Sequence, residues 1–309
     1  MSYETNQGYR GALGLIKEAV LGTAKTAQTG TLKYLEIESE TFGAPIGTAE
    51  SKGITGSRSR SKHTIVQGKK DVRGGFVING AKGADFDLLL ELSLGNYASG
   101  TGYPKDILPS FTVVRYAPPI YDIFAGCKMS KFGLASSQDD QALKLTAEVV
   151  GMTRANGVQT DLGTPSYADE IPLTHMRSTF TVASESVRTK SFGLNVVNAL
   201  DEEVYRNSQN RLALPENDLR SVDGEMMLDW NQDNIDHVLD LWEAWTFGEL
   251  MAEYTNGVYV VTVVAPNCIF PSERAKIGGP GTLEEPVKFN AFASTPGASD
   301  EVYIYRRVV

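Results

Sequence analysis

The sharpest alternation of apolar and polar residues in the chain lies near residue 290. Val287, Phe289 and Ala291 alternate with Lys288 and Asn290. A period of two sends successive side chains to opposite faces of a strand, so that one face is apolar and the other is polar. The sequence therefore predicts a half-buried strand over residues 287–292.

A glycine-rich segment precedes this strand. Three glycines and Pro280 occupy positions 278–281, a composition found both in phosphate-binding loops and in turns. A phosphate-binding loop needs a following helix and backbone N–H groups that face the anion. Here a strand pattern follows, and Pro280 lacks an N–H group. We interpret the segment as a turn between two strands.

Strand and helix patterns recur along the chain with a period of about 150 residues. The segment Val72–Gly80 matches Val222–Trp230, and each has a glycine at its third position, Gly74 and Gly224. Three further segments match in the same order: 85–92 with 235–242, 110–114 with 257–261, and 143–149 with 287–292. This order predicts two halves, each built of strands, one helix and further strands.

Each half has one predicted helix. The segment Asp85–Leu94 is apolar enough to form a strand, and only its match to the second half favours a helix. A row of tryptophans at helical spacing is more typical of a core than of a sugar-binding platform. The apolar residues at helical spacing in the second half are Ile235, Val238, Leu239, Trp242 and Trp245.

The segment between the halves has the composition of a linker. Residues 151–176 are rich in glycine, proline, serine and threonine and show little periodicity. We therefore predict a mainly β protein with a first domain over residues 1–155, a linker over 156–176 and a second domain over 177–309.

Composition and charge narrow the class of protein. The chain has 309 residues, 41% of them hydrophobic and 22% charged, which is typical of a globular protein. Its net charge of −9 argues against a protein that wraps nucleic acid with its whole surface. No run of about 18 apolar residues predicts a membrane span. Cys127 and Cys268 stand in similar surroundings; buried thiols are favoured over a disulfide.

The sequence shows no pattern typical of a catalytic or metal site. His63, His175 and His237 are scattered, and none has a second ligand at metal-binding spacing. No Gly-x-Ser-x-Gly motif occurs, and we expect no catalytic residue, metal or cofactor. A glycosidase with two carboxylates among the 38 acidic residues stays open.

One charge pattern stands out. Residues 51–70 contain no acidic side chain, whereas the corresponding segment of the second half, 195–220, leans acidic. Either these are solvated loops, or they are complementary surfaces used in self-association. Nucleic-acid binding is disfavoured because no aromatic residue is interleaved for stacking. The candidate contact residues are Lys52, Arg58, Arg60, Lys62, Lys69, Lys70, Asp201, Glu202, Glu203, Glu216 and Asp218.

The sequence resembles the tail tube proteins, or major tail proteins, of long-tailed bacteriophages, in particular their duplicated type. The resemblance rests on residues 56–95 ("GSRSRSKHTIVQGKKDVRGG" and onwards), on 260–294 ("VVTVVAPNCIFPSERAKIGG" and onwards), and on the central segments 180–184 and 194–200. These segments touch most of the chain, and they match in pattern and order.

The resemblance implies two tandem β-sandwich or partial-barrel domains, each with one flanking α-helix and a long loop. It implies a structural, non-enzymatic virion protein that forms stacked homo-oligomeric rings around a channel through which DNA passes without specific binding. Two domains per chain favour a homotrimeric, pseudo-hexameric ring over a homohexamer. Residues 51–70 match the long loop used in ring contacts. The implied partners are tape measure, tail terminator and distal tail proteins, with assembly in the host cytoplasm and no membrane.

Two rival functions remain at this stage. One is a glycan-binding β-sandwich module of a virion or cell surface that uses Trp230, Trp242 or Trp245. The other is a β-sandwich hydrolase with two acidic residues as its catalytic groups. Both predict a monodisperse monomer, whereas a tube protein predicts rings or tubes.

Overall fold

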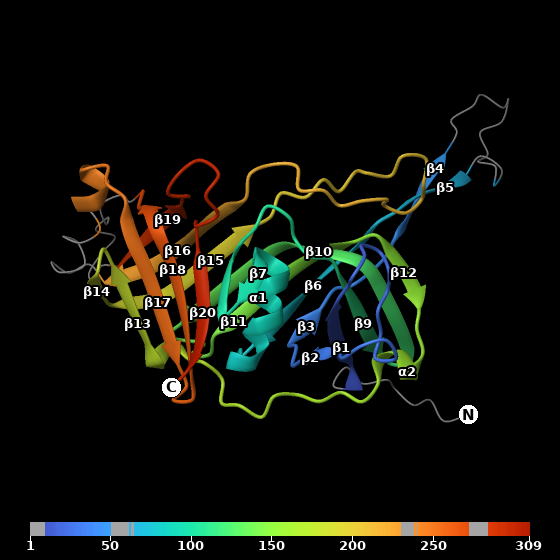
Figure 1. The fold of residues 1–309 in the computed structure, drawn as a ribbon, viewed down its shortest axis with the longest axis horizontal. Coiled ribbons are helices and arrows are strands. Elements are labelled where there is room, and N and C mark those ends of the chain that lie inside the picture. Colours follow the sequence, from blue (N-terminus) through green and yellow to red (C-terminus); the bar gives the residue numbers. More distant parts are fainter. Residues whose placement is uncertain (1–9, 51–61, 63–64, 230–237, 239, 272–283) are drawn as a thin grey trace.

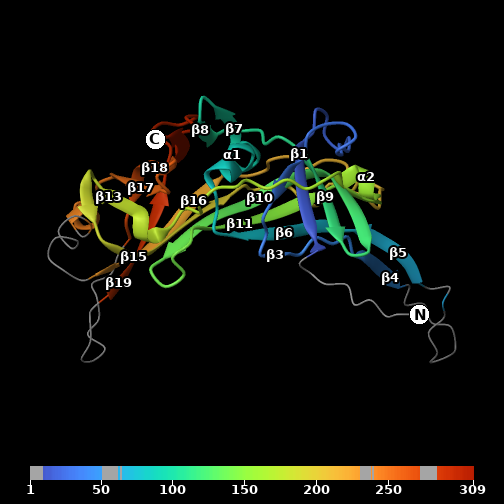
Figure 2. The same cartoon turned by 90° about the horizontal axis from the view of Figure 1, so that it is seen from below.

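The structure, a computed structural model, describes residues 10–50, 62, 65–229, 238, 240–271 and 284–309. Antiparallel strands make up most of it, with few helices (Figures 1 and 2). The prediction of a mainly β protein is confirmed, whereas the division into two tandem domains stays a prediction. Across the described ranges, no helix is long and apolar enough to span a membrane.

The regular elements follow one another in chain order. The first group of strands is β1 (Ala12–Lys17), β2 (Lys33–Leu35), β3 (Ser39–Glu40), β4 (Ile46–Glu50), β5 (Ile65–Lys70), β6 (Val72–Asn79), β7 (Gly95–Ala98), β8 (Thr101–Pro104), β9 (Phe111–Ala117), β10 (Ile120–Ser137), β11 (Lys144–Gly151) and β12 (Thr153–Asn156). The second group is β13 (Ser178–Val182), β14 (Glu185–Val187), β15 (Thr189–Val197), β16 (Ser221–Asp229), β17 (Gly248–Thr255), β18 (Tyr259–Ile269), β19 (Glu284–Ala291) and β20 (Tyr303–Val308). The α-helices are α1 (Phe86–Leu94) and α2 (Gln159–Leu162), and single 3₁₀ turns span Gly83–Asp85 and His175–Arg177.

Six strands form a central antiparallel sheet in the spatial order β6-β11-β10-β15-β16-β19. Their registers coincide, so rows of side chains cross all six strands. One row on the apolar face is Ile78, Leu145, Leu134, Leu194, Gly224 and Phe289. The adjacent row on the other face is Asn79, Lys144, Ala135, Gly193, Glu225 and Lys288. The sheet therefore has one face in the core and one polar face, which we call the open face.

The long strand β10 belongs to two layers. Its first part pairs with β9 and β12, and its second part, from Lys128 to Ser137, pairs with β11 and β15. Gly126 at the junction has φ +65°, and a Cβ there would lie 2.6 Å from the sulfur of Met152. A residue with a side chain is disfavoured at that φ. The chain can thus pass from the outer layer β1-β9-β10-β12 into the central sheet.

A similar outer layer covers the second half. Strand β17 pairs with β13 and β18, and β18 pairs with β20 and, at its end, with β19. The predicted match of residues 110–114 with 257–261 is wrong, because these segments belong to β9 and β18, which have different neighbours. The strand whose pairing corresponds to that of β9 is β17, since each lies between a hairpin partner and an outer strand.

The helix predicted over residues 85–94 is confirmed as α1. Its apolar residues are buried because the helix packs against β8 and β10. It ends at Gly95, which has φ +102°, the left-handed conformation that favours glycine at a helix end.

The second predicted helix lies largely outside the described residues. Residues 240–243 are helical, and Val238 is buried. Trp245 is 64% exposed, and its ring centroid lies 5.0 Å from that of Trp242. The core interpretation is therefore wrong for Trp245, and Trp230 falls outside the described ranges. The glycine turn at 278–281 also falls outside them.

The strand predicted over residues 287–292 is confirmed as β19. Val287, Phe289 and Ala291 are buried on its core face, whereas Lys288 and Asn290 are exposed. Both cysteines are buried and free, so the disulfide alternative is wrong. Each thiol lies 3.5 Å from the carbonyl oxygen three residues earlier, Cys127 from Phe124 and Cys268 from Ala265.

The predicted linker is packed against the body. Its Leu173 is buried and donates its backbone N–H to the Ala81 carbonyl at 2.9 Å. Lys82 donates to the Ala168 carbonyl at 2.7 Å. The linker thus follows the lower edge of the molecule in Figure 1 as a fixed connection between the halves.

Candidate assembly surfaces

The two halves are joined edge to edge along β10 and β15. Lys131–Ser137 of β10 pairs with Ser191–Val197 of β15 in antiparallel register. Edge pairing of this kind satisfies the backbone N–H and C=O groups of both strands. One continuous sheet therefore runs from the first half into the second (Figure 2).

A buried polar cluster fastens this joint. The Ser136 hydroxyl lies 2.9 Å from His175 Nδ1 and 2.9 Å from the Tyr254 hydroxyl, and His175 Nε2 lies 3.0 Å from the Thr189 carbonyl. Burial raises the pKa of Tyr254, so its hydroxyl stays protonated. The Ser136–His175 contact is of the kind that activates a nucleophile, but both residues are buried and both imidazole nitrogens are engaged. The cluster therefore suits packing between the halves.

The segment between β15 and β16, residues 198–220, leaves the second half and lies along the first half (Figure 1). We call it the crossing loop. Lys70 donates its backbone N–H to the Gln209 carbonyl at 2.8 Å, and the Tyr205 hydroxyl donates to the Lys70 carbonyl at 3.3 Å. Glu216 accepts the Leu108 backbone N–H at 3.0 Å. The middle of the loop and its C-terminal part are thus attached to the first half.

Arg211 is the anchor of the crossing loop. Its side chain has no solvent-exposed area. Its guanidinium donates to the carbonyls of Val72 at 3.0 Å, Gly151 at 3.1 Å and Glu202 at 2.7 Å, and to the Asp71 carboxylate at 2.5 Å. A guanidinium presents five N–H donors in a fixed plane, and the four acceptors use most of them. Arg211 thus attaches the crossing loop to the start of β6 and the end of β11, which lie side by side.

The Asp71 carboxylate lies between two arginines. Burial alone would raise its pKa, but hydrogen bonds from Arg73 and Arg211 outweigh this effect and leave the pKa below its usual value of 3.8. The Arg73 Nε lies 2.5 Å from the Asp71 carboxylate. Asp71 is therefore ionised near neutral pH and compensates the buried charge of Arg211.

The structure brings several of the predicted charged residues together within one chain. Lys69 forms an ion pair with Glu203. Glu202 pairs with Arg73 at 3.1 Å, and Glu216 pairs with Lys128 at 2.7 Å. Lys70 Nζ donates to the Arg154 carbonyl, and Asp201 and Asp218 accept the nearby backbone N–H groups of Glu203 and Leu219. Lys62 is exposed, and Lys52, Arg58 and Arg60 lie outside the described residues. A role of these residues between subunits stays a prediction.

Strands β4 and β5 form a two-stranded hairpin that projects from the first half (Figures 1 and 2). We call these two strands the arm. Its apolar side chains are uncovered: Ile46, Ile65 and Val66 are 49%, 51% and 59% exposed. Because these exposed apolar side chains lie on a projecting element, the hairpin is a candidate interaction surface.

Sequence reasoning missed Arg211 and Tyr205. Charge counting placed Arg211 among the few basic residues of an acidic segment and gave it no special role. No local pattern in the sequence marks Arg211, because the next residue, Leu212, is itself half exposed and the acceptors of the guanidinium lie far away along the chain.

Within the described ranges, no group of three or more His, Cys, Asp or Glu side chains is arranged to hold a metal ion. The sequence matches a protein-family model described as phage tail tube protein over residues 8–291. No curated protein matches the sequence.

Proposed function

The chain belongs to the phage tail tube protein family, and on this basis we propose that it is the ring-forming subunit of a bacteriophage tail tube. A structural role in the tail tube follows from the family match over residues 8–291. The proposal adds that copies of the chain close into rings, that the rings stack, and that DNA passes through their common channel. The subunit acts without catalysis and meets the tape measure, tail terminator and distal tail proteins at the ends of the tube.

The two halves have corresponding strand pairings, which supports the proposal of two tube domains. The order β1-β9-β10-β12 in the first half corresponds to β13-β17-β18-β20 in the second, and the pair β6–β11 corresponds to β16–β19. The free cysteines occupy corresponding places, because Cys127 pairs with Phe111 at the start of β9 and Cys268 pairs with Gly248 at the start of β17.

We take the antiparallel pairing of β10 with β15 as the model for the contact between neighbouring chains. In the second half, β15 and β16 are the strands on either side of the crossing loop. In the first half, β3 and β4 take the place of β15, since they pair with β6 and β5. Among the described residues, β4 pairs with β5 alone. This uncovered edge is the surface that we assign to the next chain, through the same antiparallel joint that β10 and β15 make internally.

Six such positions close one ring when three chains contribute two domains each. In that arrangement the open face of the central sheet lines the channel, because the opposite face forms the core. Its rows carry small and polar residues, including Gly133, Asn195 and Asp223. A wall of this kind fits transient passage of DNA.

Electron microscopy and mass measurement of the purified protein test the proposal. We expect rings or tubes, and a ring mass of three times 33.6 kDa. A monodisperse monomer under all assembly conditions contradicts the tube function, and a ring of six full chains contradicts the trimer.

The basic segment of the sequence between β4 and β5 gives a second test. Changing Arg58, Arg60 and Lys62 to glutamate reverses its charge, and we expect a folded protein that does not form tubes. A control variant with Arg177→Glu and Arg188→Glu makes the same kind of change on the exposed surface of the second half and should assemble normally. Wild-type assembly should weaken at high salt. Normal tubes from the triple variant would show that the charge of this segment plays no part in assembly.

A further inference from the structure

The arm stands apart from both layers of the protein. Among the described residues, β4 and β5 form a two-stranded sheet of their own, and every residue of β4 is exposed. A two-stranded hairpin is only marginally stable by itself in water. The direction in which the arm projects therefore depends on the contacts at its base.

The crossing loop holds the base of β5. The Lys70 backbone N–H donates to the Gln209 carbonyl at 2.8 Å, and the Lys70 carbonyl accepts the Tyr205 hydroxyl at 3.3 Å. The neighbouring Lys69 forms an ion pair with Glu203, and its Nζ lies 4.7 Å from the centroid of the Tyr205 ring. We call Tyr205 and Gln209 the clamp, because together they bind both backbone groups of Lys70.

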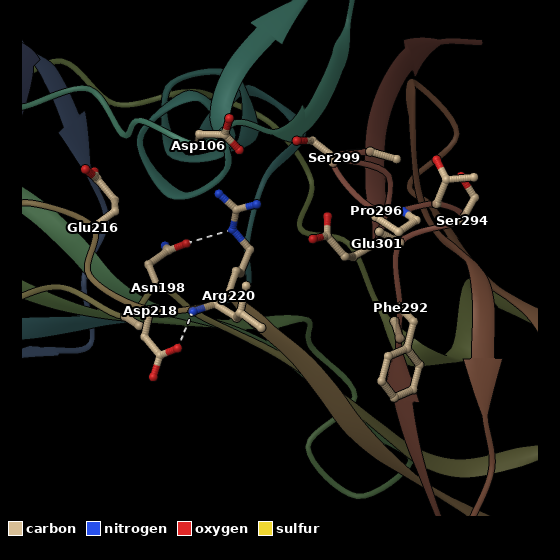
Figure 3. A pocket seen from close by; sticks show the side chains of 17 residues that line it. Asp106, Asn198, Glu216, Asp218, Arg220, Phe292, Ser294, Pro296, Ser299 and Glu301 are labelled. Carbon is tan, nitrogen blue, oxygen red and sulfur yellow. Dashed lines mark hydrogen bonds between the residues drawn. The ribbon is translucent and has the colours of Figure 1, made fainter.

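The crossing loop is itself held by the body of the protein. Arg211 is fully buried against the start of β6 and the end of β11. The two ends of the loop are joined, because Arg220 Nε donates to the Asn198 side-chain oxygen at 3.0 Å (Figure 3). The Asn198 amide in turn donates to the carbonyls of Ser93 at 2.9 Å and Met129 at 3.1 Å. The clamp is thus mounted on a fixed support.

A bulge that contains two glycines lies just beyond the clamp. The register of the arm shifts between Ile46 and Thr48, so that Gly47 lies across from Gly68 and Lys69. A Cβ on Gly68 would lie 3.2 Å from the Gly47 carbonyl oxygen, so the two backbones are in close contact. Glycine has the greatest backbone freedom, and a bulge bends the strand that carries it. The arm can therefore turn at this bulge while its base stays fixed.

We infer that the crossing loop sets the direction of the arm: the clamp fixes the base of β5, and the arm turns at the bulge of Gly47 and Gly68. The inference deepens the proposed ring function, on which its consequence for assembly rests. In a symmetric ring every copy makes the same contacts, and an element that is already ordered loses less entropy on association. The second half of a chain thus prepares the arm of its own first half for contact.

The distance between two spin labels tests this role. One label is attached to the arm at Val66→Cys and the other to the body at Val158→Cys, both exposed positions, whereas the native cysteines are buried. Double electron–electron resonance on unassembled protein should give one narrow distance distribution. Tyr205→Ala should widen it at least about twofold, because an unclamped hairpin samples more directions. The control Tyr167→Ala removes a linker ring that packs on Tyr34 and should leave the width unchanged.

Two further changes separate the clamp from the bulge. Tyr205→Phe keeps the ring and removes only the hydroxyl that binds the Lys70 carbonyl. It should also widen the distribution, and it decides the question if Tyr205→Ala does not fold. Gly68→Ala should shift the most frequent distance, because its Cβ presses on the Gly47 backbone. Gly47→Ala is the matched control, since its Cβ would lie 3.5 Å from the Lys69 carbonyl oxygen, an ordinary van der Waals distance.

Tube formation gives an independent measurement. Tyr205→Ala should raise the protein concentration needed for tubes by about tenfold, because the freed arm must be ordered on association. Unchanged widths in both Tyr205 variants, or Tyr205→Ala tubes at the wild-type concentration, would overturn the inference and leave the tube function standing. A Gly68→Ala distribution identical to that of wild type would overturn the bulge as the turning point. A wild-type protein that forms neither rings nor tubes would overturn the tube function, and the label distances would still decide whether the crossing loop directs the arm.

Discussion

At the scale of single residues, Arg211 is a buried charge that is compensated within the protein. Its guanidinium is fully buried and serves three carbonyls and one carboxylate at once. A lysine keeps the charge but has neither the planar fork nor enough donors in the right directions. The contact between the crossing loop and the first half therefore depends on arginine itself.

We predict that Arg211→Lys lowers the free energy of unfolding by about 3 kcal/mol, because it leaves buried acceptors unpaired. Urea unfolding followed by tryptophan fluorescence measures the loss. The control is Arg177→Lys at an exposed position, which should change stability by less than about 0.5 kcal/mol. Equal stability of both variants would show that Arg211 does not anchor the loop.

Because Asp71 binds Arg211, the attachment of the crossing loop to the first half should depend on pH. Its pKa in the folded protein lies below the usual 3.8, because the hydrogen bonds from Arg73 and Arg211 outweigh burial. A depressed folded-state pKa gives stability that is present above the unfolded-state pKa and is lost as pH falls through the folded-state value. We predict that the crossing loop becomes protease-sensitive below about pH 4, before the core unfolds. In Asp71→Asn the sensitivity should already exist at pH 7 and change less with pH.

The residue scale also shows what the sequence could not reveal. The buried environment of Arg211 depends on Asp71, Val72 and Gly151, which are 60 or more residues away along the chain. No local pattern encodes such a contact. The alternation around Phe289, in contrast, is local and predicted β19 correctly.

At the scale of elements, a glycine fixes how β16 packs in the central sheet. A Cβ on Gly224 would lie 2.3 Å from the Phe289 ring and 2.1 Å from the Gly193 carbonyl oxygen. Phe289 also stacks on Phe192, with ring centroids 5.9 Å apart. The third-position glycine noted in the repeat is therefore required because the ring of the neighbouring strand lies over it.

We predict that Gly224→Ala destabilises the protein by about 3 kcal/mol through overpacking. Gly193→Ala on the adjacent strand is the matched control, since the new Cβ would lie 3.8 Å from the Glu225 carbonyl oxygen, an ordinary van der Waals distance. We expect the control to change stability by less than about 0.5 kcal/mol. Thermal denaturation of both variants compares them directly, and a Gly224→Ala protein as stable as Gly193→Ala would contradict the packing argument.

Elements differ in how far the sequence predicts them. The helix α1 has an apolar sequence that fits a strand, and only the repeat favoured the correct assignment. No local pattern predicts the length of β10. Its 18 residues belong to two layers, and the strand passes from one layer to the other at a bulge that contains a glycine. Equating residues 110–114 with 257–261 failed because sequence similarity between short strands does not carry information about hydrogen-bonded neighbours.

At the scale of the whole molecule, the sheet that joins the halves also carries the open face, which we propose as the channel wall. The open face carries charges of both signs in adjacent rows. Glu148 lies across from Lys131, with their charged atoms 4.0 Å apart, and Glu225 lies across from Lys288. Mixed signs on one face avoid a continuous basic stripe along the proposed channel.

We predict that Glu148→Lys combined with Glu225→Lys turns the assembled tube into a DNA-binding surface. Each change replaces an acidic side chain of the open face with a basic one, and each phosphate that a lysine neutralises releases counterions and adds salt-dependent affinity. Retention of double-stranded DNA by tubes, measured over a range of salt concentrations, should rise for the double variant and fall steeply with salt. The control carries Glu185→Lys and Glu249→Lys at exposed positions of β14 and β17, in the outer layer of the second half, so its net charge changes equally. If the control retains as much DNA as the double variant, the total charge decides binding, and the open face does not line the channel.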